Sequence, residues 1–177
     1  MTFQRLIAGV VLGLSACFPS IAGAQALDAV RGSVVSVLPT WPPDVKRSEE
    51  PEGSGVAVLD GATVVTALHI VDRATSIRIR TAKGRIVPAK LVGLDRATDI
   101  AILSIDTPLP PLSLASEDPA LGQPVCAVGN AFGLGLSVTC GVVSGVHRAG
   151  MGFNVIEDFV QTDAAVNPGA SGGALVT

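Results

Sequence analysis

The chain has 177 residues, of which 48% are hydrophobic, 3% are aromatic and 15% are charged. That length suffices for one domain or two tightly packed halves, whose core needs no metal to fold. The formal net charge of −3 provides no basic stripe, so a nucleic-acid partner has no electrostatic support. The 20 glycines and 12 prolines favour many short segments joined by turns, which is typical of an all-β protein.

Residues 1–24 have the pattern of a secretory signal peptide. Arg5 supplies a positive charge and residues 6–16 are almost uninterrupted apolar sequence. Small-x-small cleavage sites follow at residues 22–24 (AGA) and 24–26 (AQA). A membrane anchor is one alternative, but the apolar stretch is shorter than the roughly 20 residues that a spanning helix needs.

The segment LSAC at residues 14–17 offers a second alternative, because it resembles a bacterial lipobox. Lipidation of Cys17 would tether the mature protein to a membrane, and no other tether is expected. The sequence therefore predicts a secreted or periplasmic protein, with a lipoprotein as the alternative.

The rest of the chain is divided into short strands by turn residues. A β-branched run at residues 33–38 is followed by a proline-rich, charged loop at 39–52. Residues 77–80 (IRIR) alternate with period two, as in a half-buried strand. A helical turn is expected at 67–71, and further strands are expected at residues 55–59, 63–66, 76–80, 86–94, 100–105, 124–128, 137–146 and 159–162.

A proline-rich connection at residues 107–119 marks the boundary between two halves, because a central strand could not tolerate it. The predicted organisation is a signal peptide at 1–24, a first half at 25–110 and a second half at 111–177. The strand spacing is typical of a sandwich or a barrel, and periodicity does not distinguish these two architectures.

Cys126 and Cys140 remain if Cys17 leaves with the signal peptide. They flank a turn-rich segment at residues 129–135 (GNAFGLG) and could face each other across a hairpin. In an oxidising compartment they could form a cross-strand disulfide. Two free buried thiols acting as small hydrophobic side chains are the alternative.

A serine becomes a strong nucleophile when a neighbouring base takes its proton and a carboxylate orients that base. His69 follows a buried strand and is the candidate base, whereas His147 lies in a glycine-rich turn and is interpreted as a structural histidine. Asp99 begins an apolar strand, where a half-buried carboxylate could accept a hydrogen bond from a histidine. Asp99 is therefore the candidate orienting acid, with a simple turn residue as the alternative.

Ser171 lies in the sequence GASGG at residues 169–173 and is the candidate nucleophile. The glycines permit a tight turn that directs the backbone N–H groups of Gly169 and Ser171 toward one point. Such an oxyanion hole lowers a barrier by about 3 kcal/mol per essential donor. A phosphate-binding loop at residues 129–135 is a weak alternative, because no lysine follows it.

Four sequence blocks in register resemble the HtrA/Deg group of trypsin-like serine proteases, and the likeness runs from about residue 53 to residue 174. They are a histidine block at 65–71 (VTALHIV), an aspartate block at 98–103 (TDIAIL), a block at 128–134 (VGNAFGL) and a serine block at 161–173 (QTDAAVNPGASGG). The resemblance implies two perpendicular antiparallel β-barrels with a triad of His69, Asp99 and Ser171 in the cleft between them. We expect the second barrel to be incomplete, because the chain ends at Thr177.

The resemblance also bears on substrates and activation. It implies that Ala165 and Val166 line the primary pocket, which would favour small or medium aliphatic side chains; the alternative is that both residues pack in the core. Ala170 stands where relatives carry Asn or Asp, so no ion pair with a freed N-terminus is expected. Polypeptide substrates and a homotrimer are the partners that the resemblance implies.

The sequence thus predicts an exported serine endopeptidase that cleaves unfolded or misfolded exported proteins through an acyl-enzyme. No metal or cofactor is expected. The alternative is a truncated, non-catalytic binding or chaperone-like module on the same fold.

Overall fold

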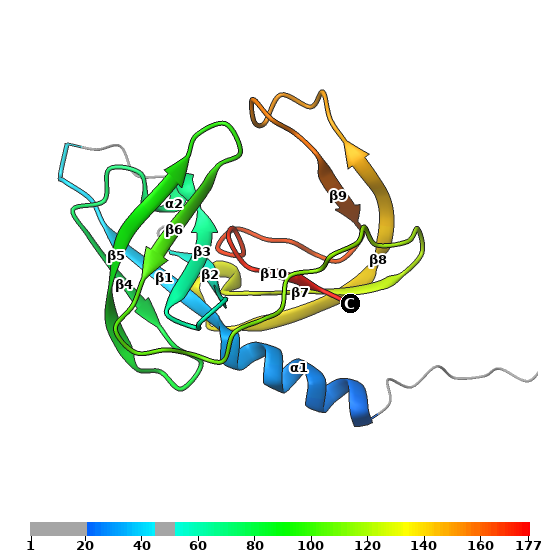
Figure 1. Ribbon diagram of the computed structural model, residues 1–177, viewed down its shortest axis with the longest axis horizontal. Coiled ribbons are helices and arrows are strands. Elements are labelled where there is room, and N and C mark those ends of the chain that lie inside the picture. The colour runs from blue at the N-terminus through cyan, green and yellow to red at the C-terminus, as the bar shows by residue number, and fades with distance from the viewer. Residues whose placement is uncertain (1–20, 45–51) are drawn as a thin grey trace, which may run out of the picture.

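The computed structural model describes residues 21–44 and 52–177, with the backbone alone for residues 21–25. Most of these residues form β-strands (Figure 1). The elements are α1 (Ile21–Ser33), β1 (Val34–Thr40), β2 (Gly53–Val58), β3 (Thr63–Ala67), α2 (Leu68–Val71), β4 (Ser76–Arg80), β5 (Ile86–Asp95), β6 (Ile100–Ser104), β7 (Pro124–Gly129), the 3-10 turn η1 (Ala131–Gly133), β8 (Ser137–Arg148), β9 (Phe159–Thr162) and β10 (Ala174–Val176).

Strands β1 to β6 close into an antiparallel barrel in the order β1-β2-β3-β6-β5-β4. Its interior is filled by apolar side chains, many of them β-branched, which suit a pleated and buried surface. In β4, Ile77 and Ile79 are buried while Arg78 is exposed, which confirms the period-two pattern. The core cluster consists of Val35, Val37, Ala57, Val64, Leu68, Ile70, Val71, Ile77, Ile79, Ala89, Ala101, Leu103 and Ile105.

Strands β7 to β10 form a second antiparallel sheet in the order β10-β7-β8-β9. This sheet curls beside the closed barrel, with β9 and β10 as its two edges (Figure 1). The expected fold class, an all-β trypsin-like pair of barrels of which the second is incomplete, is confirmed.

The helical turn expected at residues 67–71 is confirmed as α2. Three elements were not expected: the helix α1, the 3-10 turn η1, and the short strand β10, which pairs with β7. Ser33 ends α1 instead of beginning a strand. Helix α1 contains both expected cleavage sites, and within the described ranges no helix is long and apolar enough to cross a bilayer. Residues 1–20 of the predicted signal peptide, Cys17 included, lie outside the described residues.

Cys126 and Cys140 lie directly opposite each other in the β7–β8 register, and their sulfur atoms are bonded at 2.06 Å. The disulfide joins β7 and β8, the two central strands of the second sheet. The sequence had left this disulfide and two free thiols as alternatives.

The disulfide should stabilise the fold through its effect on the unfolded chain. It closes a loop with a sequence separation of 14, for which chain entropy predicts about 3 kcal/mol. The double variant Cys126→Ser/Cys140→Ser should therefore unfold in urea with a free energy lower by about 3 kcal/mol. Adding a reductant should bring the wild type to the variant's midpoint, whereas equal midpoints under oxidising conditions would contradict the prediction.

Candidate active site

His69 and Asp99 meet at one edge of the first barrel because of the β3–β6 register. Ala67 at the end of β3 lies opposite Ile100 at the start of β6. The residues immediately beyond these strand ends therefore share the same edge. His69 lies in α2 directly after β3, and Asp99 directly precedes β6.

Both carboxylate oxygens of Asp99 contact His69. The backbone N–H of His69 donates to Asp99 Oδ1 at 2.8 Å, and His69 Nδ1 lies 2.6 Å from Asp99 Oδ2. The N–H of Leu68 donates to the Asp99 carbonyl at 2.8 Å. When Asp99 is ionised and the imidazole is neutral, the proton of the side-chain bond belongs to Nδ1 and Nε2 keeps a lone pair. The imidazole is thus held in the tautomer that a general base requires.

The backbone of Asp99 has a left-handed conformation, with φ of 60°. Non-glycine residues seldom adopt it, although aspartate tolerates it better than most, and such strain is often found at functional sites. The preceding turn is fixed by Asp95, which accepts bonds from Ala97 N–H at 2.9 Å and from Thr98 Oγ1 at 2.8 Å. These two donors hold the pKa of Asp95 below its ordinary value.

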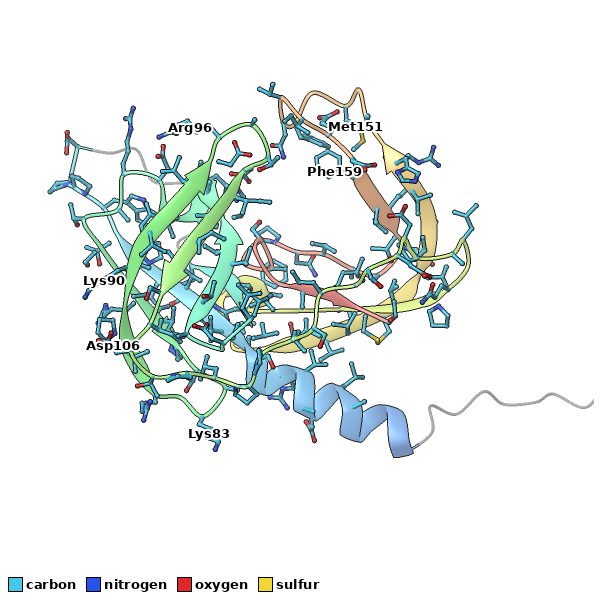
Figure 2. The ribbon with its side chains drawn as sticks, viewed as in Figure 1. Lys83, Lys90, Arg96, Asp106, Met151 and Phe159 are labelled. Atoms are coloured by element: carbon cyan, nitrogen blue, oxygen red, sulfur yellow. A yellow bond between two sulfur atoms is a disulfide. The ribbon has the colours of Figure 1, made fainter. Side chains whose placement is uncertain are left out.

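A loop of the second sheet, residues 149–158, reaches the same turn. Asn154 Nδ2 donates to the Thr98 carbonyl at 3.1 Å, and Ile156 N–H donates to the Ala97 carbonyl at 2.9 Å. Figure 2 shows the approach, with Met151 on this loop and Arg96 on the hairpin of the first barrel. The sequence had not indicated these contacts, because nothing local to Asn154 identifies its distant partner.

The carboxylate of Glu157 accepts several backbone hydrogen bonds within this loop. Glu157 accepts backbone bonds from Met151, Phe153 and Asn154 at 2.8, 2.6 and 3.2 Å. Burial by itself would raise the pKa of Glu157, but these backbone donors outweigh it and the pKa is lowered. Glu157 therefore remains ionised and keeps the loop folded against the turn that precedes Asp99.

The turn that contains Ser171 connects β9 to β10. Two of its backbone carbonyls, those of Pro168 and Ala170, accept hydrogen bonds from backbone N–H groups. Phe132 N–H donates to the Pro168 carbonyl at 2.7 Å, and Gly173 N–H donates to the Ala170 carbonyl at 2.8 Å. Because a trans peptide unit is planar, its N–H points away from its carbonyl. The N–H groups of Gly169 and Ser171 are thereby given fixed directions, as two oxyanion donors would need.

Glycine at position 172 lets the serine turn pack directly against the strand of the histidine. Its φ is +80°, and a Cβ there would lie 2.7 Å from the backbone nitrogen of Ala67. Ser171 is thus one residue from a contact with the strand that leads into His69. Among the described residues, Ser171 Oγ makes no hydrogen bond with the His69 imidazole.

Ala165 and Val166 lie beside the serine turn, where both are solvent-exposed. Together with Ala170 they help to line a cavity of about 210 Å³, whose other lining residues come from β7, η1, β8, β9 and β10 and from Gly173 just before β10. None of the described residues that line this cavity carries a charge. The position of Ala165 is fixed by its carbonyl, which accepts from Thr139 Oγ1 at 2.6 Å.

His147 lies apart from this site, at the end of β8. Its Nδ1 lies 2.9 Å from Asp158 Oδ1, and its Nε2 lies 3.3 Å from Asp118 Oδ2. The hydrogen bond with Asp158, the charge of Asp158 and the charge of Asp118 raise the pKa of His147, in that order of size. The described part of the chain contains no cluster of three or more His, Cys, Asp or Glu side chains suited to a metal ion.

Comparison with protein families gives a match over most of the chain. Residues 53–177 match a profile described as a trypsin-like peptidase domain. The periplasmic serine endoprotease DegP of Escherichia coli K12 is 46% identical over 128 residues, which cover 70% of this chain and 27% of that protein. The periplasmic pH-dependent serine endoprotease DegQ of the same strain is 42% identical over 131 residues, which cover 71% of this chain and 29% of DegQ. The chain therefore spans less than a third of the length of these curated relatives.

Solved structures show the same similarity in three dimensions. The HtrA-type protease AlgW with a tripeptide superposes with a TM-score of 0.79 at 39% identity, covering 86% of this chain and 50% of that chain. The serine endoprotease from Yersinia pestis superposes with a TM-score of 0.72 at 37% identity, covering 86% of this chain and 52% of that chain.

The environment of His147 predicts a measurable titration. Since protonation is favoured in the folded state, the imidazole should titrate by NMR above the ordinary value of about 6.5, and Asp158→Asn should lower its pKa more than Asp118→Asn does. The stabilisation of the fold by the charged His147 and its two aspartates should be complete below pH about 6.5. It should disappear as the pH rises through the pKa of His147 in the folded state. His69→Gln assigns the resonances, and an unchanged titration in Asp158→Asn would contradict the prediction.

Proposed function

Because the chain belongs to the family of trypsin-like peptidase domains, we propose that it is an exported serine endopeptidase with Ser171 as nucleophile, His69 as base and Asp99 as the orienting carboxylate. The observation that carries this proposal is the His69 Nδ1 to Asp99 Oδ2 contact at 2.6 Å, in a chain whose serine turn packs against the histidine strand. DegP and DegQ are serine endoproteases, which supports peptide-bond hydrolysis as the reaction.

The proposed reaction has two halves. In the first, Ser171 Oγ attacks the carbonyl carbon of the scissile bond while His69 Nε2 takes the hydroxyl proton and then gives it to the leaving amine. In the second, a water molecule activated by His69 attacks the acyl-enzyme, releases the acid product and regenerates Ser171. Asp99 stabilises the charged imidazolium in both halves, and neither half requires a metal or cofactor.

Stabilisation of the tetrahedral intermediate is assigned to the backbone N–H groups of Gly169 and Ser171. The carbonyls of the same two peptide units are occupied by Phe132 N–H and Gly173 N–H, which favours a fixed orientation before substrate binds. Preorganised donors cost no reorganisation during the reaction, and each essential one contributes about 3 kcal/mol.

The proposed substrates are unfolded or misfolded polypeptides outside the cytoplasm. The periplasmic relatives support that compartment. The signal peptide, the alternative lipid anchor on Cys17 and the homotrimer remain predictions from the sequence. An uncharged cavity lined by Ala165 and Val166 favours small or medium aliphatic side chains at the residue before the cleaved bond.

A fluorophosphonate probe tests the nucleophile. The folded chain should be labelled on Ser171, as identified by mass spectrometry of the tryptic peptides, and Ser171→Ala should abolish labelling. Asp99→Asn should reduce kcat on the order of 10⁴-fold, because it favours the wrong imidazole tautomer. Ser76→Ala, which removes an exposed hydroxyl at the start of β4, is the matched control. A folded but unlabelled wild type would favour the non-catalytic binding module.

A peptide library tests the pocket. Substrates with Val or Ala before the cleaved bond should have kcat/KM values at least about a hundredfold above those with Lys, because the cavity offers a buried cation no partner. Ala165→Asp supplies a carboxylate and should shift the preference toward Lys and Arg. A wild-type preference for basic residues, or an unchanged preference in Ala165→Asp, would refute this assignment.

A further inference from the structure

Ser54 of β2 is hydrogen-bonded to both segments that carry the candidate nucleophile and its base. The residue is fully buried, at 0% exposure. Its Oγ donates to the Gly169 carbonyl at 2.7 Å and accepts from the Asn130 N–H at 2.8 Å. The hydroxyl thus donates to the serine turn and accepts from the residue that follows β7.

The backbone of Ser54 extends these connections in both directions. Its N–H donates to the Ser171 carbonyl at 2.8 Å, and its carbonyl accepts from Thr66 Oγ1 at 2.6 Å. Thr66 lies in β3, the strand that leads into His69. One residue therefore connects the serine turn to the histidine strand.

The bonds from Ser54 restrain the peptide units on both sides of the proposed nucleophile. Its Oγ holds the carbonyl of the unit between Gly169 and Ala170, whose N–H is held in turn by the Asn167 carbonyl at 2.9 Å. Its N–H holds the carbonyl of the unit between Ser171 and Gly172. Because each unit is planar, these contacts limit rotation of the backbone that presents Ser171 Oγ and N–H.

Asn130, the other partner of the Ser54 hydroxyl, is itself rigidly held. It is fully buried, its Nδ2 donates to Glu52 Oε2 at 2.9 Å, and its Oδ1 accepts from Gly135 N–H at 2.9 Å. Glu52 also pairs with Arg80 of β4 at 3.3 Å. The Ser54 hydroxyl therefore sits between two fixed partners, so its orientation is determined by the surrounding fold.

We propose that Ser54 is a positioning residue that sets the register between His69 and Ser171. The inference rests on the proposed roles of those two residues. Ser54 is separated from the reacting atoms by the Gly169 and Ser171 carbonyls and acts through them. The bonds of its backbone are available to any residue at this position, so the specific contribution of serine is its hydroxyl.

Hydrogen exchange of backbone amides tests the proposal without requiring activity. In Ser54→Ala the amides of Ala170 and Gly173 should exchange at least tenfold faster than in the wild type, whereas the amide of Ile105 in the first barrel should not change. Ser36→Ala is the matched control, because Ser36 lies opposite Ser54 in β1 and is also buried at 2% exposure. Unchanged protection of Ala170 and Gly173 in Ser54→Ala would overturn the proposal.

Kinetics supply the second measurement. Ser54→Ala should lower kcat at least tenfold with KM within about twofold of the wild-type value, because the substrate cavity is intact while the nucleophile is misplaced. A rise in KM at constant kcat would contradict a positioning role. If the wild type were inactive while the exchange result held, the proposed protease function would fail and the structural role of Ser54 would stand.

A second variant covers the case in which Ser54→Ala does not fold. Thr66→Val keeps the shape of the side chain and removes the bond to the Ser54 carbonyl. It should accelerate exchange at Ala170 in the same direction and by a smaller factor. If Ala170 exchanged at the wild-type rate in this variant, the connection from the histidine strand through Ser54 to the serine turn would be refuted.

Discussion

The geometry of the candidate active site depends on how the serine turn is fixed to the first barrel, because the two halves of the chain supply different parts of it. His69 and Asp99 are positioned by neighbouring strands of one closed sheet, so the β3–β6 register is sufficient to bring them together. Ser171 has no such register with His69. Its location relative to the imidazole is determined by contacts between the halves, and buried hydrogen bonds carry much of that constraint because their loss would leave polar groups unpaired.

Contacts between the halves occur on both sides of the candidate active site. On one side, Ser54 and Gly172 bring the serine turn against β2 and β3. On the other, residues 149–158 bond to the carbonyls of Ala97 and Thr98 immediately before Asp99. The second half therefore contacts both the strand that leads into His69 and the turn that precedes Asp99. Two hydrogen bonds therefore connect the loop at residues 149–158 to the two residues that precede Asp99.

The sequence was informative where structure is determined locally. The alternation at residues 77–80 identified a strand with one buried face, and the short blocks around His69, Asp99 and Ser171 identified the trypsin-like family. It was uninformative about Ser54 and Asn130, because their bonds join positions 115 and 76 residues apart. One signal was available: glycines on both sides of Ser54 in a strand indicate close approach of other groups, and a Cβ on Gly53 would lie 2.6 Å from Ile70. The three-residue strand β10 is too short to have a periodic pattern.

The central claim is that two separately built halves form one site around Ser171. A crystal structure of the chain after reaction with a fluorophosphonate tests it most directly, since the adduct resembles the tetrahedral intermediate. The account predicts phosphorus bonded to Ser171 Oγ, with the phosphoryl oxygen within about 3.1 Å of the backbone nitrogens of Gly169 and Ser171 and His69 still bonded to Asp99. An adduct whose phosphoryl oxygen contacts neither nitrogen would contradict it.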